Sequence, residues 1–238
     1  MSSVPRPQNH LLACLPDEEW ARLVPFLETV HLSAGQSLYE SGATIRHVYF
    51  PVCGHVALHG MTESGDSSVL SLVGREGVVG VSSFMGGSSM SSHATVLAGG
   101  DFLRMRADDL LREFERSVPL LHLLLRYTQA LIAQMAQTSV CNRHHTLEKA
   151  FSRCLLLCLD RSPGNELRLT HEQMANLLGV RREGVTEAAS RLQRQGLIRY
   201  SRGRIEVLDR PGLEQGTCEC YGVIKREYDR LLPMRLAV

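Results

Sequence analysis

The stretch that decides the fold runs from Leu169 to Leu208 and reads LTHEQMANLLGVRREGVTEAASRLQRQGLIRYSRGRIEVL. Thr170 is a good N-cap residue, and Gln173 three positions later completes the pattern of a capping box. Gly179 stands where a short helix can end in a left-handed residue, which glycine adopts without strain. The apolar face of that helix consists of Met174, Leu177 and Leu178. The sequence therefore predicts a first short helix that ends in a glycine turn.

A second helix and a hairpin are predicted after this turn. The helix should begin near Arg181 and stop before Gly196. Its buried stripe consists of Val185, Ala188, Ala189 and Leu192. Residues 197–200 and 204–208 should pair around the turn at 201–203. Two helices around a glycine turn, followed by a hairpin, have the layout of a winged helix-turn-helix, which places its second helix in the major groove of DNA.

The side chains expected to contact double-stranded DNA come from the start of the first helix, the first turns of the second helix and the tip of the hairpin. They are Thr170, His171, Arg181, Arg182, Glu183, Thr186, Glu187, Arg202 and Arg204. Arginine forms planar bidentate contacts with guanine edges and with phosphates. The alternative is an ordinary helical hairpin with a solvated basic face, but it leaves the ordered succession of these three features unexplained.

The charge of the chain is unevenly distributed. The formal net charge is +1 over 238 residues, a length that allows two modest domains. Residues 1–140 hold 9 Lys+Arg against 13 Asp+Glu, a net charge of −4, whereas residues 141–238 hold 17 against 12, a net charge of +5. The basic excess therefore lies in the half with the helix-turn-helix pattern, as phosphate binding requires.

The composition describes an ordinary soluble globular protein, with 44% hydrophobic and 21% charged residues. Its sequence contains no apolar run of membrane-spanning length. The N-terminus has neither the basic region nor the apolar core of a signal peptide, so we expect a cytoplasmic location. The seven cysteines are irregularly spaced, which does not suggest a disulfide framework.

The N-terminal half is predicted to form an antiparallel β-roll. Short β-like runs alternate with glycine-containing turns between His31 and Met105, after a short helical segment over residues 10–30. The predicted fold class is therefore α+β, with a roll domain over residues 1–116 that resembles a cyclic-nucleotide-binding domain. Residues 147–238 would form the winged helix-turn-helix domain.

A long helix is predicted between these domains, over residues 117–146, because Pro119 is the only glycine or proline between Ser117 and Ser162. Seven of its residues recur at alternating steps of three and four, the spacing of a heptad seam. They are Leu121, Leu124, Thr128, Leu131, Met135, Thr138 and Asn142. We expect this seam to pair two chains, and the alternative is a helix packed against its own domain. A break before Leu147 should precede another helix that continues to Asp160.

The order of a β-roll, a long helix and a winged helix-turn-helix resembles the CRP/FNR family of bacterial transcription regulators. Besides residues 169–208, the resemblance is carried by the roll segments at 52–56 and 77–80. It implies a homodimer on a palindromic operator, RNA polymerase as a partner, and a roll domain that senses an effector. Arg182 and Glu183 match the family's base-contacting positions, and Thr170 matches a backbone-contacting one. Glu187 stands where a family member has another arginine, so the operator sequence does not carry over.

The roll departs from the family members that bind cyclic nucleotides. Their cassette supplies a glutamate for the ribose and an arginine for the cyclic phosphate, whereas Val78 occupies the glutamate position here and residues 77–103 contain no lysine or arginine. A buried phosphate would lack its strongest contacts, so we expect no tight binding of cyclic AMP. An effector pocket lined by Val78, Val79, Phe84, Ser92 and His93 and a filled, inactive roll remain alternatives. The sequence identifies no cofactor.

Cysteine and histidine residues suggest two further hypotheses. Cys141, His144 and His145 near the hinge could meet Cys218 and Cys220 to form a metal site or a thiol switch, which would make the protein a redox sensor of the same family. A Cys–His enzyme using Cys53 with His55, or Cys141 with His144, is the other hypothesis. Since no third orienting group accompanies either pair, we expect that the protein is not an enzyme.

Overall fold

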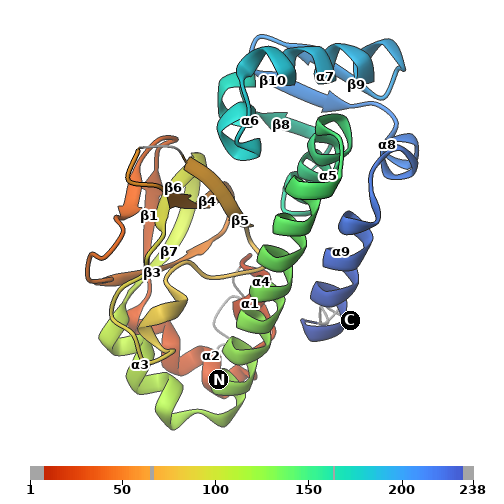
Figure 1. The fold of residues 1–238 in the computed structure, drawn as a ribbon. Helices are drawn as coiled ribbons and strands as arrows, with labels where there is room; N and C mark the ends of the chain where they lie inside the picture. The colour runs from red at the N-terminus through yellow and green to blue at the C-terminus, as the bar shows by residue number, and fades with distance from the viewer. Residues whose placement is uncertain (1–7, 65–66, 163, 233–238) are drawn as a thin grey trace.

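The computed structural model describes residues 8–64, 67–162 and 164–232, and the predicted domain ends at residues 1–7 and 233–238 lie outside these ranges. The chain forms a β-rich N-terminal part and a helical C-terminal part, joined by one long helix (Figure 1). The expected α+β class is therefore confirmed. Among the described residues, none of the helices combines the length and apolar character needed to cross a membrane.

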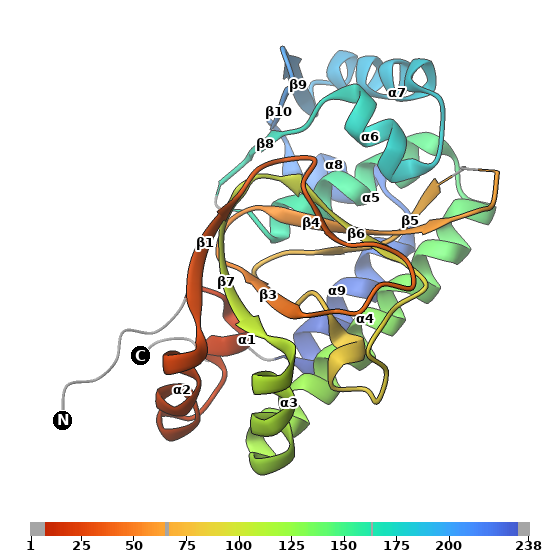
Figure 2. The same cartoon turned by 90° about the vertical axis from the view of Figure 1, so that its left-hand side faces the viewer.

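The described residues of the N-terminal part form seven strands and three helices, and the helices cover one end of the roll (Figure 2). The helices are α1 (His10–Ala13), α2 (Asp17–Leu23) and α3 (Ala107–Arg116), with the 3-10 turns η1 (Val24–Phe26) and η2 (Val81–Ser83). The strands are β1 (Glu28–Leu32), β2 (Ser37–Tyr39), β3 (His47–Pro51), β4 (His55–Met61), β5 (Ser67–Val73), β6 (His93–Ala98) and β7 (Gly100–Arg106).

These strands form two antiparallel sheets, in the orders β1-β7-β3 and β2-β6-β4-β5. Alternate side chains of each sheet point into a shared core, where Phe50, Phe102 and Val56 are 0% exposed. The register runs unbroken along β3 and β7, from His47 opposite Arg106 to Pro51 opposite Phe102. The predicted antiparallel roll is therefore present.

The long helix α4 (Val118–His144) begins at the N-cap Ser117, whose hydroxyl accepts a hydrogen bond from the Leu120 amide at 3.2 Å. It runs along the roll and contributes apolar side chains to the roll's core. These core side chains include Leu120, Leu123, Leu124, Tyr127, Ala130 and Leu131. The helix ends at the hinge before Thr146, close to the predicted break.

The seven positions of the predicted heptad seam do not form one exposed face of α4. Leu124, Thr128, Leu131 and Thr138 are buried inside the protomer, Leu121 and Met135 are half-buried, and Asn142 is exposed. Moving each of the seven positions forward by one residue gives a set that is exposed throughout. This set, which we call the free face of α4, is His122, Leu125, Gln129, Ile132, Ala136, Ser139 and Arg143. The buried seam residues contact their own domain and are not available to a partner chain. For these residues, the alternative of a helix packed against its own domain therefore holds.

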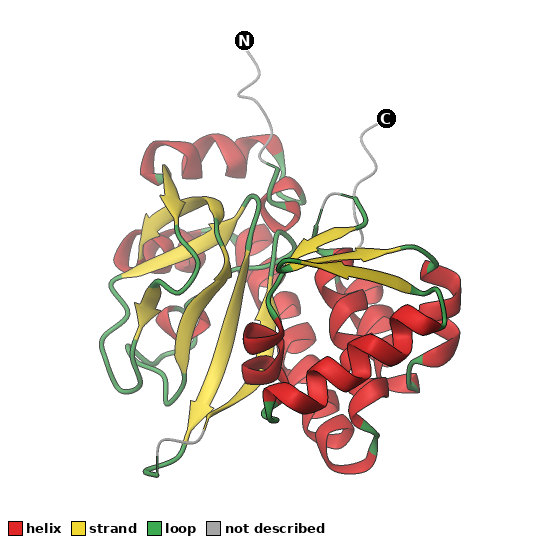
Figure 3. Ribbon diagram, turned by 90° about the horizontal axis from the view of Figure 1, so that it is seen from above, coloured by secondary structure: helices red, strands yellow, loops and turns green. Residues whose placement is uncertain are grey.

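Among the described residues, the C-terminal part has five helices and a small sheet, whose strands lie to one side of the roll strands in Figure 3. The helices are α5 (Leu147–Asp160), α6 (His171–Leu178), α7 (Arg182–Arg194), α8 (Arg210–Gly216) and α9 (Glu219–Leu231). The strands β8 (Glu166–Arg168), β9 (Ile198–Ser201) and β10 (Arg204–Val207) pair in the order β8-β10-β9. The helix predicted to continue to Asp160 is α5.

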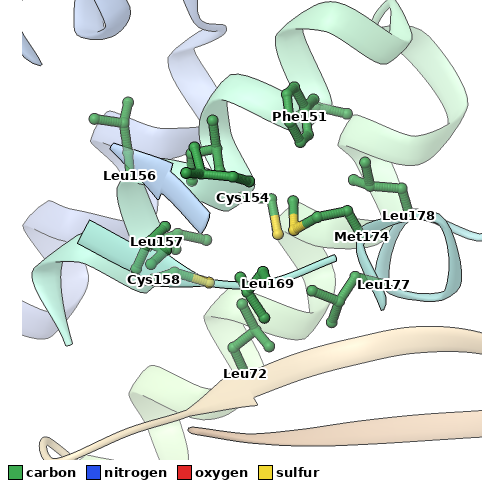
Figure 4. Close-up of a cluster of buried hydrophobic side chains, with 14 of the residues drawn as sticks. Leu72, Phe151, Cys154, Leu156, Leu157, Cys158, Leu169, Met174, Leu177 and Leu178 are labelled. Atoms are coloured by element: carbon green, nitrogen blue, oxygen red, sulfur yellow. The ribbon is translucent and has the colours of Figure 1, made fainter. Parts of the chain in front are cut away.

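The core of the C-terminal part continues into the roll. Phe151, Leu155 and Met174 are 0% exposed and belong to one buried cluster, with Cys154 and Cys158 on the same side of α5. Leu72 of β5 belongs to this cluster too, and Figure 4 shows it beside side chains of the C-terminal part. The shared core fixes the helix-turn-helix against the roll.

Helix α9 returns along α4 (Figure 1), an arrangement that the sequence analysis did not predict. Its residues Ile224 and Leu231 are buried on one side of the helix. Leu231 and the following Leu232 join the core of the roll. The last helix therefore contacts the first domain as well as the long helix.

Candidate nucleic-acid interface

The first helix of the motif, α6, has the predicted caps at both ends. The Gln173 amide donates to the Thr170 hydroxyl at 3.2 Å, and the Thr170 amide donates to the Gln173 side-chain oxygen at 2.8 Å. This reciprocal pair is the capping box. Gly179 follows the last helical residue with φ 63° and ψ 38°, the left-handed conformation that favours glycine. The local signals in the sequence therefore predicted this helix correctly.

The second helix, α7, presents its first turn to solvent. Arg181 is its N-cap, one residue before the helical start at Arg182, and Arg181, Arg182 and Glu183 are all exposed. On the opposite side, the predicted stripe is buried, with Val185, Ala188, Ala189 and Leu192 at most 2% exposed. Burial of one side holds the other side in a fixed direction. The first turn is therefore free to enter a groove, as a recognition helix requires.

The wing has a tighter turn than the sequence indicated. Ser201 and Arg204 are opposite one another in the ladder, so the turn contains only Arg202 and Gly203. Both have positive φ, 47° and 80°, which is the conformation of a two-residue type I′ hairpin turn. Arg202 and Arg204 are exposed, and the Arg204 guanidinium lies 3.3 Å from Glu166 of β8. Strand β8, which the sequence analysis missed, thus supports the wing from the other side.

His171 and Thr186 form a bridge between α6 and α7. The His171 Nδ1 and Thr186 Oγ1 atoms are 3.0 Å apart, and the imidazole stacks on the Tyr200 ring with 3.9 Å between centroids. Burial, followed by the nearby Arg182 charge, lowers the pKa of His171, so the neutral imidazole is favoured. These contacts hold the two helices and the wing in one arrangement. Tyr200 is a positioning residue that the sequence analysis did not single out.

Glu187 is exposed and pairs with Arg191 of its own helix. Arg191 lies 3.3 Å from Glu187 and also 3.3 Å from Glu148 of α5. Arg191 therefore draws the Glu187 carboxylate toward the body of the domain. Arg182 and Glu183 are exposed at the start of the same helix.

The roll touches the helix-turn-helix at α6. Gln173, besides completing the capping box, donates its side-chain amide to the Leu97 carbonyl of β6 at 3.1 Å. The Gly179 turn approaches Ser67 and Ser68 at the start of β5. A movement of β5 or β6 in the roll would therefore be transmitted to α6, the helix that positions α7.

The residues proposed to line an effector pocket mostly fill the core of the roll. Val78, Val79 and Phe84 are at most 4% exposed and pack in the roll's hydrophobic cluster. Ser92 is buried, and the half-buried His93 pairs through Nδ1 with the Glu40 carboxylate. A cavity of ≈ 210 Å³ lies elsewhere, where α1, α5 and α9 approach one another. Its walls include His10, Glu76, Arg161, Ile224, Tyr228 and Asp229.

Four of the five metal candidates converge at the hinge. The ligand atoms of Cys141, His145, Cys218 and Cys220 all lie within 4.8 Å of one another, whereas His144 is exposed and outside the group. A hydrogen bond from the Cys141 thiol lowers the pKa of Cys218 to about 5. The fold thus joins residues that are more than 70 positions apart in the sequence.

The two pairs considered for an enzyme do not form nucleophile–base contacts. Cys53 precedes β4 and accepts a hydrogen bond from the Asp101 amide, whereas His55 is buried with its Nε2 3.1 Å from the Cys158 carbonyl. In the other pair, His144 is exposed and is not a member of the hinge cluster that contains Cys141. Neither geometry offers an activated thiol beside a free imidazole.

Two family profiles match the chain. The profile of the cyclic nucleotide-binding domain matches residues 29–117, and that of the Crp-like helix-turn-helix domain matches residues 152–215. The first match covers the strands of the roll, and the second covers α6, α7 and the wing. The two profiles therefore follow one another in the order predicted from the sequence.

Proteins with similar sequences or structures include two that are named as regulators. The global nitrogen regulator of Synechococcus elongatus is 25% identical over 198 residues, which are 79% of this chain and 89% of that protein. The structure of FixK2 from Bradyrhizobium japonicum covers 81% of this chain and 98% of its own, with a TM-score of 0.69 and 17% identity. TTHB099, a transcriptional regulator of the CRP family from Thermus thermophilus, covers 79% and 95%, with a TM-score of 0.65 and 19% identity. The two structures establish the similarity of the fold.

Proposed function

The chain belongs to the CRP/FNR family of transcription regulators, and from this premise we propose that it acts as a homodimer on a palindromic DNA operator. Residues 1–116 would sense a signal other than cyclic AMP, residues 117–146 would join two chains, and residues 147–238 would bind DNA. The proposal places the protein in the cytoplasm, with RNA polymerase as a further partner. Like the family as a whole, it would regulate transcription without catalysing a reaction.

The observation that most supports recognition of DNA bases is the exposed first turn of α7, which is held on a rigid support. Arg182 and Glu183 are exposed, while Val185 one turn along is completely buried. The His171–Thr186 bridge and the stacked Tyr200 ring hold α6, α7 and the wing together. Base recognition requires side chains held in one direction by such a scaffold. The basic residues at the wing tip would add phosphate contacts.

The free face of α4 supports the proposed dimer. Leu125 and Ile132 are 41% and 58% exposed, one heptad apart on a helix that otherwise covers the roll. An apolar stripe at this spacing suits the same stripe of a second chain, because two-fold pairing buries each leucine or isoleucine against its counterpart. A helix-turn-helix protein reads a palindrome by such pairing. The proposed occupant of this face is therefore a second copy of the chain.

The experiment that tests the proposed function is selection from a random double-stranded DNA library, followed by sequencing of the bound fragments. We expect enrichment of an inverted repeat. The matched control is Arg182→Ala, which removes an exposed side chain and leaves the buried side of α7 intact. Selection by the control should relax at the bases that Arg182 contacts. Absence of any enriched sequence with the folded wild-type protein would contradict the proposal.

A further inference from the structure

Four potential metal ligands surround one point at the hinge. Cys141 lies in the last turn of α4 and His145 caps that helix, while Cys218 caps α9 and Cys220 lies in its first turn. The Sγ atoms of Cys141 and Cys218 are 3.6 Å apart, and the Cys220 Sγ is 3.4 Å from the His145 Nδ1. The three cysteines are buried, and the His145 side chain is only 15% exposed. The C-terminal end of α4 and the N-terminal end of α9 therefore contribute to one cluster.

The spacing of the donor atoms matches a single tetrahedral ion. Zinc–sulfur bonds of about 2.3 Å place the sulfur atoms of a tetrahedron about 3.8 Å apart, and zinc–nitrogen bonds are slightly shorter. All four donor atoms lie within 4.8 Å of one another, with the two closest contacts near the tetrahedral value. Two metal ions would need two separate groups of donor atoms, and the largest distance between donor atoms would then be greater. The geometry favours a mononuclear site.

The surroundings provide hydrogen bonds suited to the ligands of a metal. The His145 Nε2 lies 3.3 Å from the Glu219 carboxylate, which would fix the ring with Nδ1 toward the sulfur atoms. The Gln137 side-chain amide donates to the Cys220 sulfur at 3.1 Å, as it would to a thiolate. Nearby, the buried Arg153 guanidinium contributes a positive charge beside Cys141. Three thiolates and a neutral imidazole around a divalent ion carry one net negative charge, which Arg153 would offset.

We propose that Cys141, His145, Cys218 and Cys220 form a binding site for one divalent metal ion of the zinc type. Three thiolates and one imidazole are a known structural zinc set, and soft sulfur ligands disfavour magnesium or calcium. All four positions are protein ligands, so the ion has no open position for catalysis. It joins the end of the long helix to the start of α9, whose far end packs on the roll. The ion therefore fastens α9 across the hinge.

The test is metal analysis of the full-length protein purified under reducing conditions without chelator. We expect about one zinc ion per chain, and after replacement by Co²⁺ a visible spectrum with thiolate-to-cobalt charge transfer and tetrahedral ligand-field bands. Bound zinc should also protect Cys141, Cys218 and Cys220 from alkylation, as mapped by mass spectrometry. Cys14 and Cys53, which are only partly buried, serve as internal controls because zinc should leave their alkylation unchanged.

Substitutions distinguish the residues that bind the metal from the residues beside them. Cys220→Ser should lose the cobalt charge-transfer intensity of one thiolate and most of the bound zinc. Glu219→Gln, which alters the hydrogen bond to His145, should lower zinc affinity by roughly 10–100-fold while keeping the spectrum. His144→Ala is the matched control beside His145 and should bind zinc like the wild-type protein. Zinc-dependent thiol protection in the wild-type chain tests the site even if Cys220→Ser fails to fold.

Three outcomes would overturn the inference. The first is folded wild-type protein with no bound metal and no zinc affinity in a direct titration. The second is two iron ions with sulfide per chain, which would mean a cluster instead of a single ion. The third is a native disulfide between Cys141 and Cys218 in a metal-free preparation. The inference does not depend on the proposed DNA binding, since each readout measures the metal itself.

Discussion

Arg161 at the end of α5 and Glu76 of the roll form an ion pair, with 2.5 Å between Nε and Oε1. Arg161 is only 4% exposed, and its other nitrogens donate to the Gln134 side chain of α4 and to the Leu157 carbonyl, both at 2.8 Å. The guanidinium also lies over the Tyr228 ring of α9, 5.3 Å from its centroid. One buried side chain thus joins the roll, the long helix, the DNA-binding domain and the C-terminal helix.

Arg161→Leu should lower the free energy of unfolding by about 3–5 kcal/mol, because it leaves the partly buried Glu76 carboxylate without its partner. Urea denaturation measures the change. Adding Glu76→Gln to this variant should recover part of the loss, since no unpaired charge remains. Lys225→Ala, which breaks an exposed pair with Asp229, is the control and should change stability far less. Equal losses from Arg161→Leu and Lys225→Ala would refute the proposed junction.

His55 should make the stability sensitive to mild acid. Burial is the main cause that lowers its pKa from 6.5 to about 4, so the folded protein keeps the ring neutral while the unfolded chain takes up a proton. The free energy of unfolding should therefore fall as the pH drops from about 6.5 to 4, by roughly 3 kcal/mol from this residue. His55→Gln can still donate to the Cys158 carbonyl and should flatten the profile over this range. The same slope in both proteins would contradict the assignment.

Arg182→Ala should weaken binding to the selected operator by about 1–3 kcal/mol and relax the preference for particular bases, because an exposed arginine at the helix start reads base edges. Arg202→Ala at the wing tip should instead weaken binding to all DNA. It should also reduce the slope of the logarithm of the binding constant against the logarithm of the salt concentration by about 1. Fluorescence anisotropy on specific and scrambled duplexes at several salt concentrations measures both. A uniform loss for Arg182→Ala would make it a phosphate contact.

Ile132→Asp should separate the dimer, since it places a carboxylate in the middle of the free face of α4. The dissociation constant should rise by roughly 100-fold, about 3 kcal/mol, because the charge must be desolvated when two chains meet. Sedimentation velocity over a dilution series measures it. Asn142→Asp, at an exposed position one residue outside the free face, is the control. Dissociation by Asn142→Asp alone would restore the seam first predicted from the sequence.

Cyclic AMP should not bind the protein with submicromolar affinity. The segment that would supply a cation for its phosphate carries none, and the His93 ring in that segment is already paired with the Glu40 carboxylate. Val78, at the position of the family's ribose contact, and the adjacent Val79 are buried in the core. Isothermal titration calorimetry gives the answer directly. A dissociation constant below about 1 μM would show that the roll has another way to hold the phosphate.

Local signals made the helix-turn-helix predictable. The capping box at Thr170, the left-handed Gly179 and the apolar stripe from Val185 onward each depend on residues a few positions apart. The hairpin of the wing was predicted too, but its turn contains only Arg202 and Gly203 and not the three residues expected. Strand β8 was missed because three residues at the edge of a sheet carry too little periodicity to be recognised.

The register of α4 and the hinge cluster depend on distant parts of the chain. Leu124 and Leu125 are adjacent leucines, and only the packing of the roll decides that one is buried and the other exposed. A shared site of Cys141 and Cys218 was a hypothesis from the sequence, which contains no signal that favours His145 over His144. That choice follows from the end of α4 and the return of α9, an element that was not predicted.

Whether two chains read a palindromic operator is decided by the mass and the footprint of the complex with the selected DNA. Sedimentation equilibrium on one duplex, combined with hydroxyl-radical footprinting, gives the number of chains and the protected positions. We expect about two chains per duplex and two symmetric protected half-sites about 34–36 Å apart. One chain per duplex, or protection without two-fold symmetry, would contradict a homodimer that reads a palindromic operator.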